Sequence, residues 1–282
     1  MARSTAASLK DEVTFTPGTP LESIDPASTP GWEDGQKKAE KELARVGEKL
    51  SDLQEQLFAE GRSGGSRSVL LVLQGMDSSG KGGIVRHVIG LVDPQGVAHQ
   101  SFGKPTEEEL SHDFLWRIKN ALPTPGYIGV FDRSHYEDVL VARVNSLVTQ
   151  DVIEERYNLI NQFEKELVDS GTTIVKVMLH ISYDEQKDRL AERLERPDKF
   201  WKYNPGDIDE RLKWPAYTDA FQRMLDKTDT DYAPWHVVPA SEKWYARLAV
   251  SELLLAALES LDLTWPEADF DVEAEKARLA AT

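Results

Sequence analysis

The chain has 282 residues, of which 40% are hydrophobic and 29% charged, a composition that predicts a globular protein with one large α/β domain and appendages. Its formal net charge of −16 argues against a general nucleic-acid-binding protein. The sequence contains no cysteine, which excludes disulfides and thiolate chemistry. It shows neither a membrane-length apolar run nor a signal-peptide pattern, so we expect a cytoplasmic protein without membrane contact.

The first 66 residues predict an arm and one long helix. Residues 1–31 combine four prolines with many Ser and Thr and predict a flexible arm, mobile or extended. Residues 32–66 predict an N-terminal helix whose apolar face could form a seam with a second copy, as in a dimer or tetramer, or could pack on its own domain. The apolar residues with heptad spacing are Ala39, Leu43, Val46, Leu50, Leu53 and Leu57.

Residues 68–90 combine a strand, a glycine-rich turn and a helix. Residues 69–73 are apolar throughout, as in a strand buried on both faces of a parallel sheet. The turn has the spacing G-x-x-x-x-G-K of a phosphate-binding loop, in which backbone N–H groups converge on phosphate oxygens and the lysine reaches the outer phosphates. The candidate phosphate-binding residues are Gly75, Ser78, Ser79, Gly80, Lys81, Gly82 and Gly83.

The loop contains an aspartate and lacks one usual metal ligand. Gly82 follows Lys81, at a position where Ser or Thr normally contacts magnesium. A carboxylate inside an anion-binding turn would repel phosphate unless a cation lay between them, so Asp77 is interpreted as a magnesium-side residue. The alternative is a glycine-rich turn with a local side-chain hydrogen bond.

Four more apolar segments predict strands, at residues 97–102, 127–131, 172–180 and 235–238. A capping box at residues 106–109 predicts one helix carrying Leu110, Phe114, Leu115 and Ile118. Further helices are expected from about Asp151, from the box at 182–185 and from Ser241. Strands that alternate with helices in this way predict a five-stranded parallel sheet covered on both faces, a three-layer α/β fold.

The third predicted strand ends in Asp132 and Arg133. An apolar strand that ends in aspartate downstream of a phosphate loop is typical of a Walker B strand, whose end the sheet brings beside the loop. Asp77 and Asp132 are then candidate ligands of Mg²⁺, with Mn²⁺ as a second candidate, and Arg133 would offset charge on a transferred group. The alternative is a turn with an Asp132–Arg133 surface ion pair. Glu137 is either a nucleotide-side carboxylate or a solvated helix start.

Residues 189–213 form a basic segment in an acidic chain, with interleaved aromatic residues and two prolines. This segment predicts a bent helical lid, about residues 189–228, that binds a long polyanion. A solvated helix face with ion pairs such as Glu192–Arg196 is the alternative. The basic residues are Arg189, Arg193, Arg196, Lys199, Lys202, Arg211 and Lys213.

Five blocks resemble the polyphosphate kinase 2 family: GMDSSGKGG at 75–83, SFGKPTEEELSHDFLWR at 101–117, IGVFDRSHYEDVLVARV at 128–144, ERPDKFWKYNPGDIDERLKW at 195–214 and APWHVVPASEKWYARL at 233–248. The resemblance covers roughly residues 35–260. It implies a P-loop kinase core like that of thymidylate kinase over residues 67–262, with the lid above it and a C-terminal tail at 263–282. It also implies reversible, Mg-dependent phosphoryl transfer from inorganic polyphosphate to a nucleotide.

The resemblance implies roles for single positions as well. Asp77 and Asp132 match the metal-side acids, Lys81 the loop lysine and Arg133 the arginine beside the second acid. The block around Glu137 resembles the subgroup that phosphorylates nucleoside mono- and diphosphates, which makes AMP, ADP, GMP and GDP the expected acceptors, although many members carry Asn where this chain has Asp132. An ATP-dependent nucleotide kinase and a non-catalytic nucleotide switch are the competing functions. Polyphosphate-binding candidates are Lys104, Arg193, Lys199 and Lys202.

Overall fold

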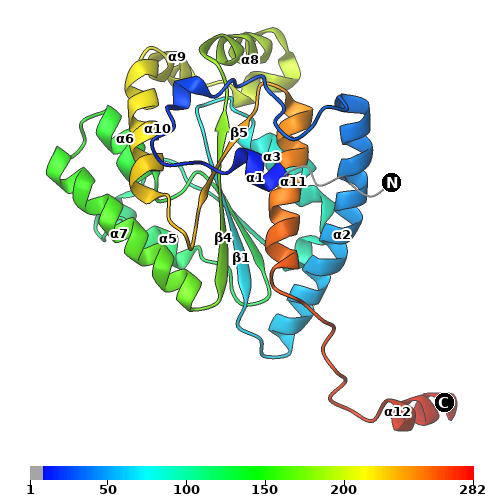
Figure 1. Ribbon diagram of the computed structural model, residues 1–282. Helices are drawn as coiled ribbons and strands as arrows, with labels where there is room; N and C mark the ends of the chain where they lie inside the picture. Colours follow the sequence, from blue (N-terminus) through cyan, green and yellow to red (C-terminus); the bar gives the residue numbers. More distant parts are fainter. Residues whose placement is uncertain (1–8) are drawn as a thin grey trace.

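A computed structural model describes residues 9–282 and shows a parallel five-stranded sheet with helices on both faces (Figure 1). The strand order is β2-β3-β1-β4-β5, and each neighbouring pair is parallel. All five predicted strands and the three-layer α/β fold are confirmed. The strands are β1 (Ser68–Gln74), β2 (Val97–Ser101), β3 (Ile128–Asp132), β4 (Thr172–His180) and β5 (Trp235–Pro239).

Strand β1 lies at the centre because its side chains are apolar on both faces. Val69, Leu71 and Leu73 pack into one apolar layer, whereas Leu70 and Val72 pack into the other. The first layer contains α1 (Leu9–Val13), α2 (Gln36–Arg62), α3 (Lys81–His87) and α11 (Lys243–Glu259). The second contains α5 (Trp116–Asn120), α6 (Glu137–Val144), α7 (Gln150–Asp169) and α10 (Trp214–Thr228).

The remaining elements lie at the edges of this sandwich. Helix α8 (Tyr183–Glu195), the 3-10 helix η4 (Pro197–Lys202) and α9 (Gly206–Arg211) follow the carboxyl end of β4, at the top of Figure 1. Helix α12 (Val272–Ala280) buries none of its side chains and stands apart from the body (Figure 1). Short 3-10 helices η1 (Leu21–Ser23), η2 (Ile89–Leu91) and η3 (Pro94–Gly96) complete the connections.

The prediction of a flexible arm is wrong for residues 9–31, while residues 1–8 lie outside the described residues. Leu9, Val13, Phe15 and Leu21 are all buried. The N–H of Phe15 donates to Trp235 O at 2.8 Å, beside an antiparallel bridge from Thr14 to β5. Because β5 is an edge strand with unpaired backbone groups, the arm finds there both hydrogen bonds and an apolar surface.

The apolar face of α2 packs on its own domain, which was one of the two alternatives. Val46, Leu50 and Leu57 have no exposed surface, and α2 lies against α11 and the 3-10 helices η2 and η3. The described structure therefore uses the buried part of this face within the chain.

The single helix predicted from residue 106 is also wrong. The capping box forms, with Glu109 N donating to Thr106 Oγ1 at 3.2 Å, but α4 (Glu107–Leu110) ends after one turn. The Oδ1 of Asp113 then accepts from Leu115 N at 3.0 Å in a turn that precedes α5. An aspartate side chain that bonds nearby N–H groups competes with the helix ladder and divides the segment.

Candidate functional site

The loop between β1 and α3 has the backbone of an anion-binding turn. Gly75 and Gly80 have φ angles of +144° and +112°, and Ser78 has +67°. A Cβ at residue 75 would lie 2.6 Å from Leu179 O in β4, so only glycine fits there. Within residues 9–282 the buried Oγ atoms of Ser78 and Ser79 have no hydrogen-bond partner, which leaves their polar groups to a ligand.

Lys81 lies at the base of the loop and is 7% exposed. Its Nζ donates to Gly75 O at 2.7 Å and to Met76 O at 3.2 Å. Burial lowers the pKa of Lys81 and Arg133 adds to this, against the opposing effect of Asp77, Asp132 and Glu137. The structure thus brings together the lysine, the arginine and the three acids that the sequence assigns to one site.

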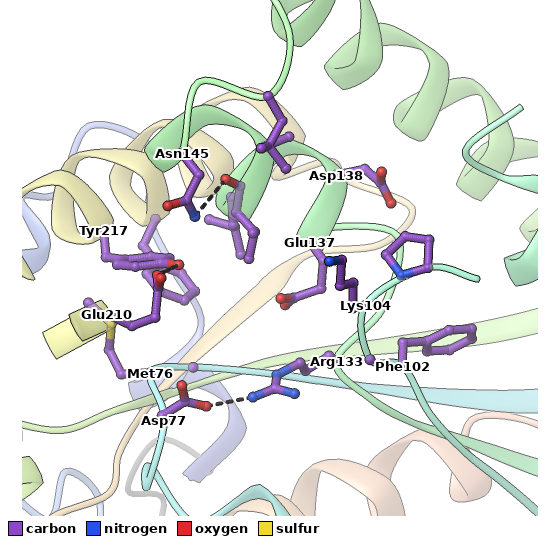
Figure 2. A pocket seen from close by; sticks show the side chains of 18 of the residues that line it. Met76, Asp77, Phe102, Lys104, Arg133, Glu137, Asp138, Asn145, Glu210 and Tyr217 are labelled. Atoms are coloured by element: carbon purple, nitrogen blue, oxygen red, sulfur yellow. Dashed lines mark hydrogen bonds and ion pairs between the residues drawn. The ribbon is translucent and has the colours of Figure 1, made fainter. Parts of the chain in front are cut away.

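Arg133 pairs with Asp77 rather than with Asp132. Its Nη2 lies 2.5 Å from Asp77 Oδ1 (Figure 2), and its backbone N–H donates to Leu73 O at 3.0 Å. Burial alone would raise the pKa of Asp77, but Lys81 and Arg133 outweigh it and lower that pKa. Asp77 is therefore an ionised carboxylate, and the alternative of an Asp132–Arg133 surface pair is wrong.

The acids fit a cation that a substrate helps to hold. Asp77 and Asp132 line the same cavity beside Lys81, and carboxylate oxygens are ligands that Mg²⁺ prefers. Among residues 9–282, no group of three or more acidic or histidine side chains could hold a metal by itself. Two carboxylates would leave most of the coordination shell to phosphate oxygens and water, as is usual for Mg²⁺ at phosphoryl-transfer sites.

This loop cavity has a volume of about 750 Å³ and is lined by the phosphate loop, Asp132 and many basic side chains. The predicted Arg193, Lys199 and Lys202 of the basic segment are among them. Three more cations were not predicted: Arg86 on α3, and Lys243 and Arg247 on α11. The sequence signal for them was weak: Arg86 follows Lys81 by five residues, and Lys243 and Arg247 lie one helical turn apart within the block 233–248.

The other four basic residues of that segment have partners within the protein, although Arg189 also lines the loop cavity. Arg196 pairs with Glu192 and Asp198 at the surface, as the solvated-face alternative expects. The guanidinium of Arg211 lies 3.3 Å from the centre of the Tyr183 ring. Contacts of Lys213 and Arg189 are likewise within the protein. The segment is therefore only partly a polyanion surface.

A second cavity of about 790 Å³ is also lined by Asp77 (Figure 2). Its walls combine apolar side chains such as Tyr217 and Phe221 with charged ones. Glu137 lines this cavity and is half-buried, so it is not a solvated helix start. Burial raises the pKa of Glu137, and this effect exceeds the opposing effect of Arg133 and Lys81. Lys104 also lines this second cavity and does not line the loop cavity with the other predicted polyphosphate-binding residues.

Asp77 and Arg133 line both cavities, so the ion pair marks the place where the two volumes meet. Two anionic ligands, one in each cavity, would face each other across a guanidinium and a carboxylate able to hold a cation. Such head-to-head placement of anions is the geometry that phosphoryl transfer requires.

The family model of polyphosphate kinase 2 matches residues 33–264. The chain belongs to the polyphosphate kinase 2 family. An AMP/ADP-polyphosphate phosphotransferase of Meiothermus ruber is 47% identical over 247 residues, 88% of this chain and 91% of that protein. An ADP-polyphosphate phosphotransferase of Rhodopseudomonas palustris is 42% identical over 232 residues, 78% of this chain and 79% of that protein.

A solved structure agrees with this assignment to the polyphosphate kinase 2 family. The crystal structure of polyphosphate kinase 2 from Arthrobacter aurescens is 52% identical, covers 100% of this chain and 99% of that one, and has a TM-score of 0.96. The predicted family and enzyme class, a kinase among the transferases, are confirmed. No helix in residues 9–282 has both the length and the apolar character needed to cross a bilayer.

Proposed function

We propose that this polyphosphate kinase 2 transfers the terminal phosphoryl group of inorganic polyphosphate to AMP or ADP, with GMP and GDP as further acceptors, in a reversible reaction. One observation carries the proposal: a cavity lined by the phosphate loop and many cations meets a second, partly apolar cavity at Asp77 and Arg133. The names of the Meiothermus and Rhodopseudomonas relatives support this choice of donor and acceptor.

The loop cavity suits a polymer better than a single triphosphate. Its cations come from α3, α8, η4 and α11, well beyond the loop itself. Segment 189–228 contributes to both cavities, with Arg193 in the loop cavity and Glu210 and Tyr217 in the second. We therefore assign this segment the role of a lid that closes over both substrates and excludes water.

The chain's own residues perform most of the catalysis. Mg²⁺ held by Asp77 and Asp132 would supply neutralisation of the phosphate charges. Arg133 lies at the boundary of the cavities, where its guanidinium would stabilise charge on the transferred group. A nucleotide phosphate oxygen needs no general base, which agrees with a fully buried His135 that contacts Glu164 at 3.1 Å.

The cellular location and the oligomeric state of the enzyme are part of the same proposal. A cytoplasmic location accords with nucleotide acceptors and with a chain free of cysteine. A homo-oligomer, dimer or tetramer, would use surfaces other than the buried part of the apolar face of α2, because α11 packs against that helix.

The test supplies Mg²⁺ and long-chain polyphosphate with AMP or ADP separately and follows nucleotide products by luminescence and chromatography. Asp77→Asn should lower turnover about 100-fold or more, since it removes a metal ligand and the partner of Arg133. Asp198→Asn is the matched control, because Asp198 is exposed and lines neither cavity.

Two results would contradict the proposal. Transfer from ATP but not from polyphosphate would favour the ATP-dependent nucleotide kinase, and nucleotide binding without any transfer would favour the switch. Unchanged turnover of Asp77→Asn would remove the metal assignment.

A further inference from the structure

We propose that Arg189 is a positioning residue that holds the phosphate loop in its anion-binding shape and joins it to two other walls of the loop cavity. The inference rests on the proposed function, in which this cavity receives polyphosphate. Arg189 belongs to the basic segment and lines the cavity, yet it is only 6% exposed. Its contacts show why it is not a ligand of the polymer.

Every N–H of the Arg189 guanidinium already has an acceptor within the protein. Its Nε donates to Glu185 Oε1 at 2.6 Å. Its Nη1 donates to Ser78 O at 2.9 Å and Ser79 O at 3.0 Å, and its Nη2 to Ala240 O at 2.6 Å and Ser241 O at 3.1 Å. Since arginine has about five N–H donors in a fixed fork, none remains for a phosphate.

On the loop side, the backbone carbonyls of residues 75–79 all accept hydrogen bonds from side chains of the protein. Lys81 binds the carbonyls of residues 75 and 76, Gln186 binds Asp77 O at 3.0 Å, and Arg189 binds the next two. Carbonyl oxygens that faced the ligand would repel phosphate. In a trans peptide the N–H points opposite to the C=O, so the bond to Ser79 O turns the N–H of Gly80 away from Arg189.

On the other side, Arg189 holds the chain just after β5. Residues 240 and 241 lead directly into α11, which carries Lys243 and Arg247 into the loop cavity. Helix α8 itself places Arg193 there, one turn beyond Arg189. One buried guanidinium thus joins three segments whose amides and cations must act together on one polyanion.

Arg189→Lys should keep the positive charge but remove the planar guanidinium with its donors on three nitrogen atoms. The lysine ammonium has three donors from a single point and cannot span the carbonyls of two segments. Arg189→Lys should therefore raise the KM for polyphosphate about 10- to 100-fold, the usual effect of removing a group that orients ligands. The KM for ADP should change less than about threefold, because the second cavity is not lined by Arg189.

The experiment compares Arg189→Lys with Arg196→Lys in the full chain, with Mg²⁺, polyphosphate and ADP. Arg196 undergoes the same change in the same segment, but it is exposed and lines neither cavity. In parallel, amide hydrogen exchange of the substrate-free proteins is followed over residues 75–83 and 240–247, with β2 as internal reference. We expect faster exchange in both segments only in Arg189→Lys.

A wild-type enzyme inactive with polyphosphate would refute the proposed function, while the exchange data would still test the positioning role. Unchanged loop exchange in Arg189→Lys, or equal rises in both KM values, would overturn that role. If Arg189→Lys does not fold, Glu185→Gln replaces it, because the Glu185 carboxylate is the charged partner of Arg189 among residues 9–282. A KM rise confined to polyphosphate then supports the role, and no change in KM or exchange overturns it.

Discussion

Arg133 has a left-handed backbone, with a φ of +62°, at the end of β3. A residue other than glycine in this region stores of the order of 1 kcal/mol of strain and keeps it where neighbours enforce the conformation, often at functional sites. Here the bond from Arg133 N to Leu73 O enforces it, and the side chain reaches Asp77. The sequence predicts both residues for the site, but their pairing depends on how β1 and β3 lie side by side.

At the residue scale, a substitution of Glu137 should change the KM for the nucleotide and leave the KM for polyphosphate nearly unchanged. Glu137 lines the second cavity only, so Glu137→Gln should raise the KM for ADP about tenfold, as for the loss of one charged hydrogen bond, and leave that for polyphosphate within about twofold. Burial raises the pKa of Glu137, so on acidification it takes up a proton at a higher pH than an ordinary glutamate. The variant should therefore lack part of the acidic decline in kcat/KM for ADP.

Steady-state kinetics with each substrate varied, between about pH 5 and 8, check this prediction. Glu155→Gln is the control, since Glu155 is exposed on α7 and lines neither cavity. A rise in the polyphosphate KM alone would assign Glu137 to the other substrate.

At the scale of elements, the buried apolar face of α2 should contribute to the free energy of unfolding of the chain. Leu50 is fully buried within the first apolar layer, so Leu50→Ala should lower the free energy of unfolding by about 2–5 kcal/mol. Urea unfolding measures this, with the exposed Glu55→Ala expected within about 0.5 kcal/mol of wild type. If light scattering showed Leu50→Ala dissociating a folded oligomer instead, the face would belong to an interface between copies.

The contact between the N-terminal arm and β5 should make stability depend on pH. Thr14 Oγ1 lies 3.1 Å from Nδ1 of His236, and burial, with Lys10 and Lys176, lowers the pKa of His236 to about 4. The unfolded chain, with a histidine pKa of about 6.5, then binds the proton more readily, so stability is lost as the pH falls from about 6.5 to about 4.

By pH 5 this loss should reach about 2 kcal/mol, and His236→Gln should flatten that part of the curve. Urea unfolding at several pH values measures it, with the exposed His99→Gln as control. Equal pH dependence in His236→Gln and wild type would show that another group titrates.

For the whole molecule, the essential contrast is a basic cavity within a chain of net charge −16. Salt screens the attraction of a long polyanion to many cations more strongly than the fit of a nucleotide in a partly apolar cavity. Between about 50 and 200 mM NaCl we expect the KM for polyphosphate to rise at least about tenfold and that for ADP about threefold or less. Equal rises in the KM for polyphosphate and the KM for ADP would place the polymer outside the loop cavity. A series with sucrose in place of NaCl controls for general solvent effects.

By itself, the sequence determined the five strands, the phosphate loop, the two acids that lie beside Lys81 and the family. These depend on short apolar runs, on spacing within a few residues and on sequence blocks, all of which are local. Only the tertiary structure decided that Arg189 bonds to the loop carbonyls, that Lys104 lies in the second cavity and that the N-terminal arm pairs with β5. The physical reason is that a parallel sheet brings together strand ends and loops far apart in the chain, so the partner of a charge depends on topology rather than on its neighbours in sequence.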